Sequence, residues 1–269
     1  MPISNSDWLR NVTLLHGPRD LLTQYFGLAD SHARDAGLHL TIRADFSGLI
    51  ELNRARHDMW PPIPPIFDPG QSAINPASAF WLEGRDEKGE TIVAHAVRLF
   101  DLRGSLDDEL RSLGAFYADP TCHLANGERF EVSGTSASAI SGRVVHGGAF
   151  WVHADYRRQG LASFVPRITR ACAFARWNPG FIWGFVEQRL HAGGLTQAYG
   201  PYQSTDVVVS GIEWRRGVTF HLVWMTAQAM LADIERIVDQ ESNDRSRRSE
   251  IPRTNRSPPL PRHGVRNLS

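Results

Sequence analysis

The sequence has little cysteine, no net charge and no long hydrophobic run, and each absence excludes a class of protein. Cys122 and Cys172 are the only cysteines in 269 residues, too few for the disulfide framework of a small secreted domain. The 29 basic and 29 acidic side chains balance, so the whole molecule exerts no long-range attraction on nucleic acid or an anionic membrane. The densest apolar run, Phe181 to Val186, is far too short to cross a bilayer.

Lysine and metal-ligand pairs are also scarce. Lys88 is the only lysine among the 29 basic residues, a bias that reflects genome composition more often than function. Cys122 and His123 form a pair of possible metal ligands, but no second pair has ligand spacing, so no metal site is predicted. The first eleven residues lack the basic start and apolar core of a signal peptide. We therefore expect a cytoplasmic protein without membrane contact.

The apolar content of 42% with 22% charged residues is that of a soluble chain able to bury a core. Residues 1–37 are predicted to form a helical extension, and residues 38–240 the main domain. Residues 101–146 are an insertion rich in turn-forming residues. Residues 241–269 hold seven arginines against three acids and few apolar side chains, so we expect a disordered tail. A solvated end explains this tail more simply than a nucleic-acid contact.

Hydrophobic periodicity predicts a mixed α/β domain. The expected helices cover residues 19–36, 47–57, 106–116, 160–177, 191–199 and 226–238. The expected strands cover residues 38–46, 79–86, 91–100, 129–132, 144–153, 181–186, 206–214 and 218–226. Ser47 is the expected N-cap of the second helix. The short links at 87–90 and 215–217 join antiparallel neighbours, which favours a mostly antiparallel sheet over a doubly wound parallel one. The proline-rich segment 61–70 is predicted to be a stiff surface loop.

The segment from Arg157 to Ala162, with the sequence RRQGLA, lies between a predicted strand and a predicted helix. The first turn of a helix presents unpaired amides and the positive end of its dipole, which favour an anion such as a pyrophosphate. Gly160 permits close approach of a ligand to the backbone, and the two arginines can add charge-assisted contacts. On spacing alone, an ordinary polar turn before an amphipathic helix explains the same residues.

Arg157-x-x-Gly160-x-Ala162 fits the Gln/Arg-x-x-Gly-x-Gly/Ala signature of the GNAT superfamily of N-acetyltransferases, and residues 150–177 resemble its central motif. The flanking order of elements is also similar to that superfamily over about residues 38–226. The resemblance implies a GNAT-like α/β fold with a mostly antiparallel, centrally splayed sheet flanked by helices. It also implies acetyl-CoA as the acyl donor and an amine of a small molecule or protein as the acceptor.

The same resemblance assigns the acetyl-CoA contacts. Loop amides from Arg158 to Ser163 would hold the pyrophosphate, and the strand around Trp151 and Val152 would pair with the pantetheine arm and polarise the acetyl carbonyl. The implied cofactor-binding residues are Trp151, Val152, Arg157, Arg158, Gln159, Gly160, Leu161, Ala162 and Ser163.

The chain departs from the family at the catalytic acid. Thr196 stands where such enzymes often have a tyrosine, and Arg189 stands where they often have an asparagine. Tyr199 lies one helical turn after Thr196 and is our candidate acid toward the coenzyme thiolate, with Tyr202 as second choice. An aromatic residue that simply packs at a helix end is an equally good explanation of Tyr199.

Candidate bases are Glu187 near the end of one strand and His153 on another, because a histidine titrates near neutrality. His95 and His221 also lie on predicted strands, so a purely structural histidine is the competing interpretation. The favoured function is an acetyl-CoA-dependent N-acetyltransferase. The alternatives are a non-catalytic acyl-CoA-binding or regulatory module, which the missing tyrosine favours, and a nucleic-acid-associated protein acting through its tail.

Overall fold

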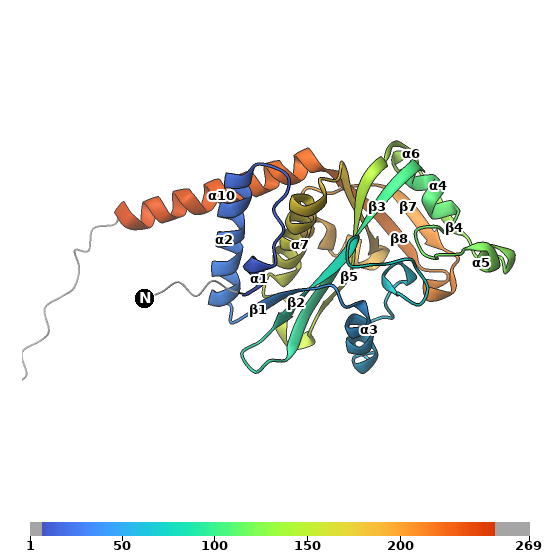
Figure 1. The fold of residues 1–269 in the computed structure, drawn as a ribbon, viewed down its shortest axis with the longest axis horizontal. Coiled ribbons are helices and arrows are strands. Elements are labelled where there is room, and N and C mark those ends of the chain that lie inside the picture. Colours follow the sequence, from blue (N-terminus) through green and yellow to red (C-terminus); the bar gives the residue numbers. More distant parts are fainter. Residues whose placement is uncertain (1–6, 251–269) are drawn as a thin grey trace, which may run out of the picture.

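One eight-stranded sheet organises the molecule, in the order β1-β2-β3-β5-β6-β8-β7-β4. The computed structural model describes residues 7–250, and Figure 1 shows their arrangement. The strands are β1 (His39–Arg43), β2 (Ala79–Arg85), β3 (Thr91–Ser105), β4 (Phe130–Ser133), β5 (Ser141–Val152), β6 (Phe181–Glu187), β7 (Gln203–Ser210) and β8 (Thr219–Thr226). Among these strands only β5 and β6 are parallel neighbours. The predicted mixed, mostly antiparallel fold is confirmed, and a doubly wound parallel sheet is excluded.

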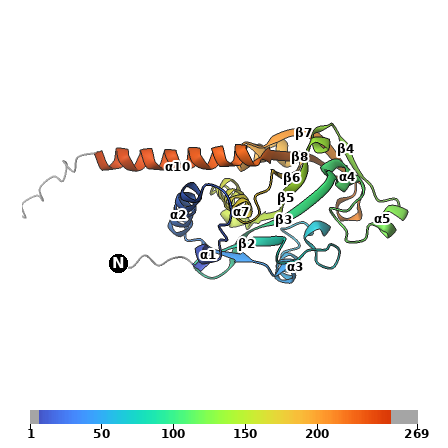
Figure 2. The same ribbon diagram turned by 45° about the horizontal axis from the view of Figure 1, so that its top comes forward.

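Helices cover both faces of this sheet (Figures 1 and 2). The α-helices are α1 (Asp7–Arg10), α2 (Arg19–Asp35), α3 (Phe46–Ala55), α4 (Leu106–Arg111), α5 (Thr121–Ala125), α6 (Ser136–Ala139), α7 (Leu161–Trp177), α8 (Gln188–Ala192), α9 (Leu195–Tyr199) and α10 (Ala227–Glu250). Three short 3-10 helices are η1 (Pro65–Phe67), η2 (Ala154–Tyr156) and η3 (Glu213–Arg215). Helices α2, α7 and α10 share one buried cluster, so the N-terminal helices pack onto the sheet domain.

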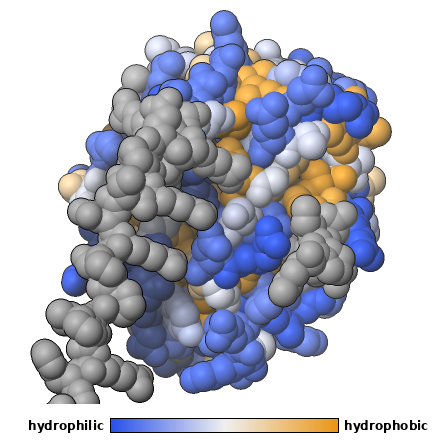
Figure 3. Space-filling view, turned by 90° about the vertical axis from the view of Figure 1, so that its left-hand side faces the viewer, coloured by the Kyte–Doolittle hydropathy of each residue, from blue (hydrophilic) through white to orange (hydrophobic). Residues whose placement is uncertain are grey.

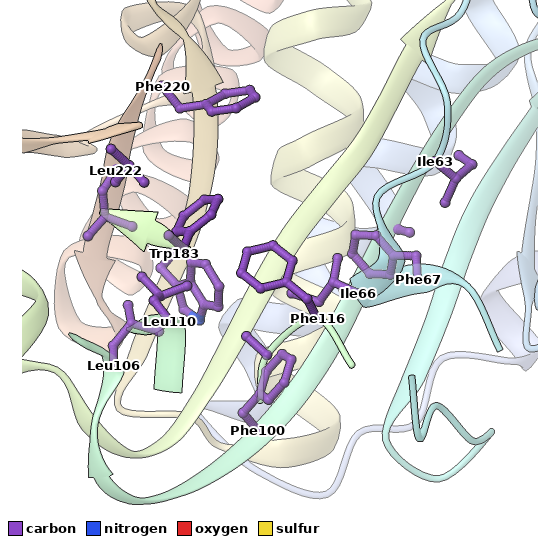
Figure 4. Packing of buried hydrophobic residues seen from close by; sticks show 14 of the residues in the cluster. Ile63, Ile66, Phe67, Phe100, Leu106, Leu110, Phe116, Trp183, Phe220 and Leu222 are labelled. Carbon is purple, nitrogen blue, oxygen red and sulfur yellow. The ribbon is translucent and has the colours of Figure 1, made fainter. Parts of the chain in front are cut away.

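The second buried cluster fills the opposite face, beneath α3, α4 and the proline-rich segment. Figure 4 shows Phe116 between Trp183 on one side and Phe67 on the other. Ring contacts continue from Phe116 to Phe130, with centroids 4.7 Å apart. Because Phe116 and Phe130 belong to residues 101–146, the insertion contributes core as well as turns.

On the side of the molecule shown in Figure 3, hydrophilic residues surround patches of hydrophobic ones.

Several element boundaries differ from the sequence-based expectations. Asp45, not Ser47, caps α3, because its carboxylate accepts the amide of Gly48 at 3.1 Å. The single helix expected at 191–199 is two short helices, since Gly194 adopts a φ of +86° between them. Thr226 caps α10 as expected, accepting from the amide of Ala229 at 3.1 Å.

Helix α10 continues to Glu250 and extends past α2 (Figures 1 and 2), so the first ten residues of the expected tail are helical. Residues 251–269 of that tail lie outside the described residues. The prediction that segment 61–70 is a surface loop is wrong, because Ile66 and Phe67 are buried. Their burial is possible because the Arg98 guanidinium donates to the Ile66 carbonyl at 2.8 Å, satisfying a group that a proline-rich backbone leaves unpaired.

The two parallel strands at the centre of the sheet separate after a short contact. Their register runs over four pairs, from Val144 with Phe181 to Gly147 with Gly184. A β-carbon on Gly184 would lie 2.8 Å from the Gly147 carbonyl oxygen, so this approach requires glycine. Beyond that pair β5 continues to Val152 and β6 continues to Glu187, but the two strands no longer pair with each other. The predicted central splay is thereby confirmed.

A β-bulge in β5 accompanies the separation. The register with β3 shifts so that Ala94 faces Trp151 and Ala96 faces Gly148. His95 therefore stands opposite two residues of β5, and one of them, Ala149, has a φ of +48°. A bulge of this kind bends the strand and redirects its side chains. The bulge lies beside the opening between β5 and β6.

Candidate active site

A cavity of about 930 Å³ lies at the opening between β5 and β6. Its walls come from the divergent ends of both strands, from the loop before α7, from α9, and from segments 57–64 and 214–215. Residues 148–152 of β5 pair with β3 on one side and have no β6 partner on the other. The cavity thus borders a strand edge that can pair with an extended ligand.

The loop 157–160 and the first turn of α7 form one end of the cavity. Gly160 precedes the helix with a φ of +80°, and Arg158 also has a positive φ of +66°. Within the described residues, no backbone or side-chain acceptor takes the amide hydrogens of residues 158–162. The arginine side chains at 157 and 158 are exposed beside them. Five unpaired amides, a helix N-terminus and two guanidinium groups make this end suited to an anion.

Eight of the nine predicted cofactor residues line this cavity: Trp151, Val152, Arg157, Arg158, Gly160, Leu161, Ala162 and Ser163. Gln159 is not among the lining residues, and its side-chain amide donates to the Asp155 carbonyl at 3.2 Å. A β-carbon on Gly160 would meet no atom within 4 Å, so its side of the loop is open.

Tyr199 also lines the cavity, at the C-terminal end of α9. Its ring stands edge-on to Phe150 of β5, with centroids 5.8 Å apart. Burial raises the pKa of the Tyr199 hydroxyl, so the phenol keeps its proton at neutral pH. Tyr202, the second choice, is not a lining residue; its ring lies under the Arg170 guanidinium at 5.7 Å. Thr196 is buried, and its hydroxyl pairs with His191 at 2.8 Å.

Of the two candidate bases, the structure brings only Glu187 to the cavity. One carboxylate oxygen of Glu187 lies 2.6 Å from Arg215 and the other 2.5 Å from Arg189. His153 is not a lining residue, and its Nδ1 accepts the Asp155 amide at 3.4 Å as the cap of η2. The structure therefore does not bring His153 to the cavity wall, because β5 ends at Val152 and the chain turns into η2.

Two cavity residues were missed as site candidates by sequence reasoning, His95 and His146. His95 Nδ1 lies 2.6 Å from the Thr169 hydroxyl of α7, and His146 packs against Trp183 with ring centroids 4.1 Å apart. Burial lowers the pKa of each imidazole to about 3, so both are neutral at physiological pH. His146 lies on β5, the same strand that carries Trp151 and Val152, and this position in the sequence could have marked it as a site candidate.

A buried ion-pair network holds the two ends of this site together. One carboxylate oxygen of Asp233 in α10 accepts from Arg167 at 2.9 Å and from Arg170 at 2.8 Å, both on α7. Arg170 also donates to the carbonyl of Tyr199, and Arg167 donates to the carbonyl of Ser163 at 2.7 Å. A single carboxylate on α10 thus fixes two arginines that contact both the first turn of α7 and the end of α9.

No group of three or more His, Cys, Asp or Glu side chains in the described part of the chain could hold a metal ion. No helix within residues 7–250 is both long and apolar enough to span a membrane.

The sequence matches no family model and no curated protein. Solved structures similar to the chain are acetyltransferases. NAA60 of Arabidopsis thaliana in complex with acetyl-CoA is 14% identical, over 71% of this chain and 99% of that one, with a TM-score of 0.43. The spermidine N-acetyltransferase of Vibrio cholerae, in complex with CoA and spermine, is 13% identical over 71% and 98%, with a TM-score of 0.41. A GNAT-family acetyltransferase of Streptococcus pneumoniae is 10% identical over 70% and 98%, with a TM-score of 0.39.

Asp233→Asn is expected to destabilise the protein by about 3 kcal/mol at pH 7, because it leaves the buried Arg170 cation without its partner. The neighbouring arginines lower the pKa of Asp233 in the folded state, against the desolvation that would raise it. The stability that Asp233 contributes is therefore fully present above the pKa of an aspartate in the unfolded chain. It is lost as the pH falls through the lower pKa of Asp233 in the folded protein. Urea unfolding at pH 7 and below pH 4 measures this: the gap between wild type and variant should narrow in acid.

Asp239→Asn is the matched control, since Asp239 is an exposed carboxylate on the same helix. Equal stability of the Asp233 and Asp239 variants at pH 7 would show that the network contributes nothing to folding.

Proposed function

We propose that the protein is an N-acetyltransferase that moves the acetyl group of acetyl-CoA to a primary amine. The observation that carries this proposal is the run of unpaired amides at residues 158–162, which opens onto a cavity between two separated strands. An anion-binding turn continuous with a deep, partly apolar channel suits a ligand with a pyrophosphate at one end and a thioester at the other.

The residues present fit such a donor in three respects. The loop supplies amides and arginines for the pyrophosphate, and the open side of Gly160 leaves room for it. The unpaired edge of β5 at 148–152 supplies backbone groups for the amide-containing arm. The cavity volume of about 930 Å³ is large enough to admit an acceptor beside that arm.

The reaction needs a proton acceptor for the amine and a proton donor for the thiolate. The amine nitrogen bonds to the thioester carbonyl carbon, the carbon–sulfur bond breaks, and the thiolate takes the Tyr199 proton. Tyr199 lines the cavity beside Phe150 and carries a proton at neutral pH, because burial raises the pKa of its hydroxyl. Glu187 is the only carboxylate shared by the cavity wall and β6, and we assign it the proton lost by the amine, directly or through water.

A non-catalytic acyl-CoA-binding module is the second candidate. Thr196 favours this candidate, because it stands where a tyrosine acid is expected. Its side chain is buried against His191 and does not line the cavity. Both candidates require acetyl-CoA to bind, and they differ in whether Tyr199 has a chemical role.

Gly160→Val is expected to weaken acetyl-CoA binding by more than about tenfold, because a side chain would strain a φ of +80° and project into the ligand's space. Isothermal titration calorimetry measures the affinity. Gly127→Val is the matched control, with a φ of +81° and an equally open side, but outside the cavity. Equal affinity in the two folded variants would mean that the loop does not hold the donor.

Tyr199→Phe keeps the ring and its packing against Phe150 and removes only the hydroxyl. We expect a fall in kcat of about a hundredfold with acetyl-CoA affinity unchanged, as for the loss of a general acid. Release of CoA thiol in the presence of an amine is the assay. Because burial raises the pKa of Tyr199, the hydroxyl should lose its proton, and turnover should fall for that reason, only in strong alkali. Wild-type turnover in this variant would remove Tyr199 from the mechanism.

A further inference from the structure

The acceptor end of the cavity is built from aromatic rings. Trp60 stacks on Trp151 with centroids 5.1 Å apart and planes 12° apart. On the β6 side Trp214 stacks on Phe220 with centroids 5.7 Å apart and planes 6° apart. All four residues line the cavity. Each side of the opening therefore carries a stacked pair of aromatic rings, next to aliphatic lining residues such as Val186 and Leu195.

These two walls are joined to one another. The Trp214 indole N–H donates to the carbonyl of Pro62 at 2.7 Å, which ties η3 to the proline-rich segment. Trp60, Pro62 and Trp214 also border a second cavity of about 420 Å³, so the rings stand at the junction of the two spaces. The hydrogen bond fixes the indole in place before any acceptor arrives.

The charges of this end do not suit a polycation. Among residues 7–250 only two carboxylates line the cavity, Asp58 and Glu187, and Glu187 is already paired with Arg189 and Arg215. Asp58 is exposed at the rim. Among the described residues, the interior of the cavity thus has no carboxylate besides Glu187 that could hold a further ammonium group. The two arginines are likewise committed to Glu187 and are not free to hold an acceptor carboxylate.

Two large apolar side chains are exposed beside the charged residues of the rim. Met59 and Leu190, two of the exposed large hydrophobic residues among those described, both line the mouth of the cavity. Aromatic rings inside, apolar side chains at the mouth and one ion-paired carboxylate beside them define the chemistry of a fitting acceptor. Aromatic rings prefer offset or edge-on contact with another aromatic ring over an equal aliphatic surface.

Resting on the proposed function, we infer that the acceptor is a primary monoamine carried on a flat aromatic body, which binds against Trp214, Phe220 and Trp60. The amine then lies toward β5 and Glu187, and the ring occupies the junction between the cavities. Trp214 is a specificity-determining residue in this arrangement.

The test compares phenethylamine with 2-cyclohexylethylamine, which has the same chain and a ring of similar size that is not flat, and with spermidine as a polycation. Acetyl-CoA binding is first measured by calorimetry, and CoA thiol release is then followed with each amine. We expect kcat/KM for phenethylamine to exceed that for 2-cyclohexylethylamine by about tenfold and that for spermidine by more.

Variants locate the preference. Trp214→Leu should abolish the preference for phenethylamine, and Trp214→Phe should retain most of it although it lacks the bond to Pro62. Trp224→Leu is the matched control, a half-buried tryptophan of β8 outside the cavity, and should leave the preference unchanged.

The outcomes separate this inference from the proposal beneath it. If acetyl-CoA binds but phenethylamine is acetylated no faster than the other amines, or not at all, the acceptor class is overturned and donor binding stands. A preference that survives in Trp214→Leu overturns the assignment of the ring site. Failure of acetyl-CoA to bind removes the proposed function and this inference together.

Discussion

The short parallel contact between β5 and β6 is the constraint on which the site depends. Its four residue pairs end at Gly147 and Gly184, where the backbones approach too closely for any β-carbon on Gly184. Because pairing stops there while both strands continue, a strand edge and a cavity appear inside an otherwise continuous sheet. The bulge at Ala149 turns β5 further along this edge. The loop before α7 then lies at one end of the opening and the aromatic walls at the other.

The second constraint is the pairing of Asp233 with two arginines of α7. A buried ion pair adds little net stability compared with apolar packing, yet removing one partner is costly. Here the arginines are also donors to the carbonyls of Ser163 and Tyr199, so the network links the first turn of α7 to Tyr199. Helix α10 thereby takes part in the geometry of a site that it does not line.

Local signals predicted the parts of this structure that depend on local chemistry. Helical spacing placed α7, and the glycine before it marked the turn whose amides are unpaired. The signals failed where distant segments meet. The burial of Ile66 depends on Arg98 from β3, and the aromatic walls join η3 to the proline-rich segment, contacts that no local period records. His153 was a candidate base in the sequence because strand patterns do not show where β5 ends, and it lies just after that end.

The most direct measurement of the central claim is amide hydrogen exchange in the loop before α7, with and without saturating acetyl-CoA. The amides of residues 158–162 have no acceptor among the described residues and should exchange fast in the free protein. If they bind the pyrophosphate, exchange in peptides covering 157–164 should slow by at least about tenfold when acetyl-CoA is bound. Unchanged exchange at saturation would contradict the account, because the donor would then be held elsewhere.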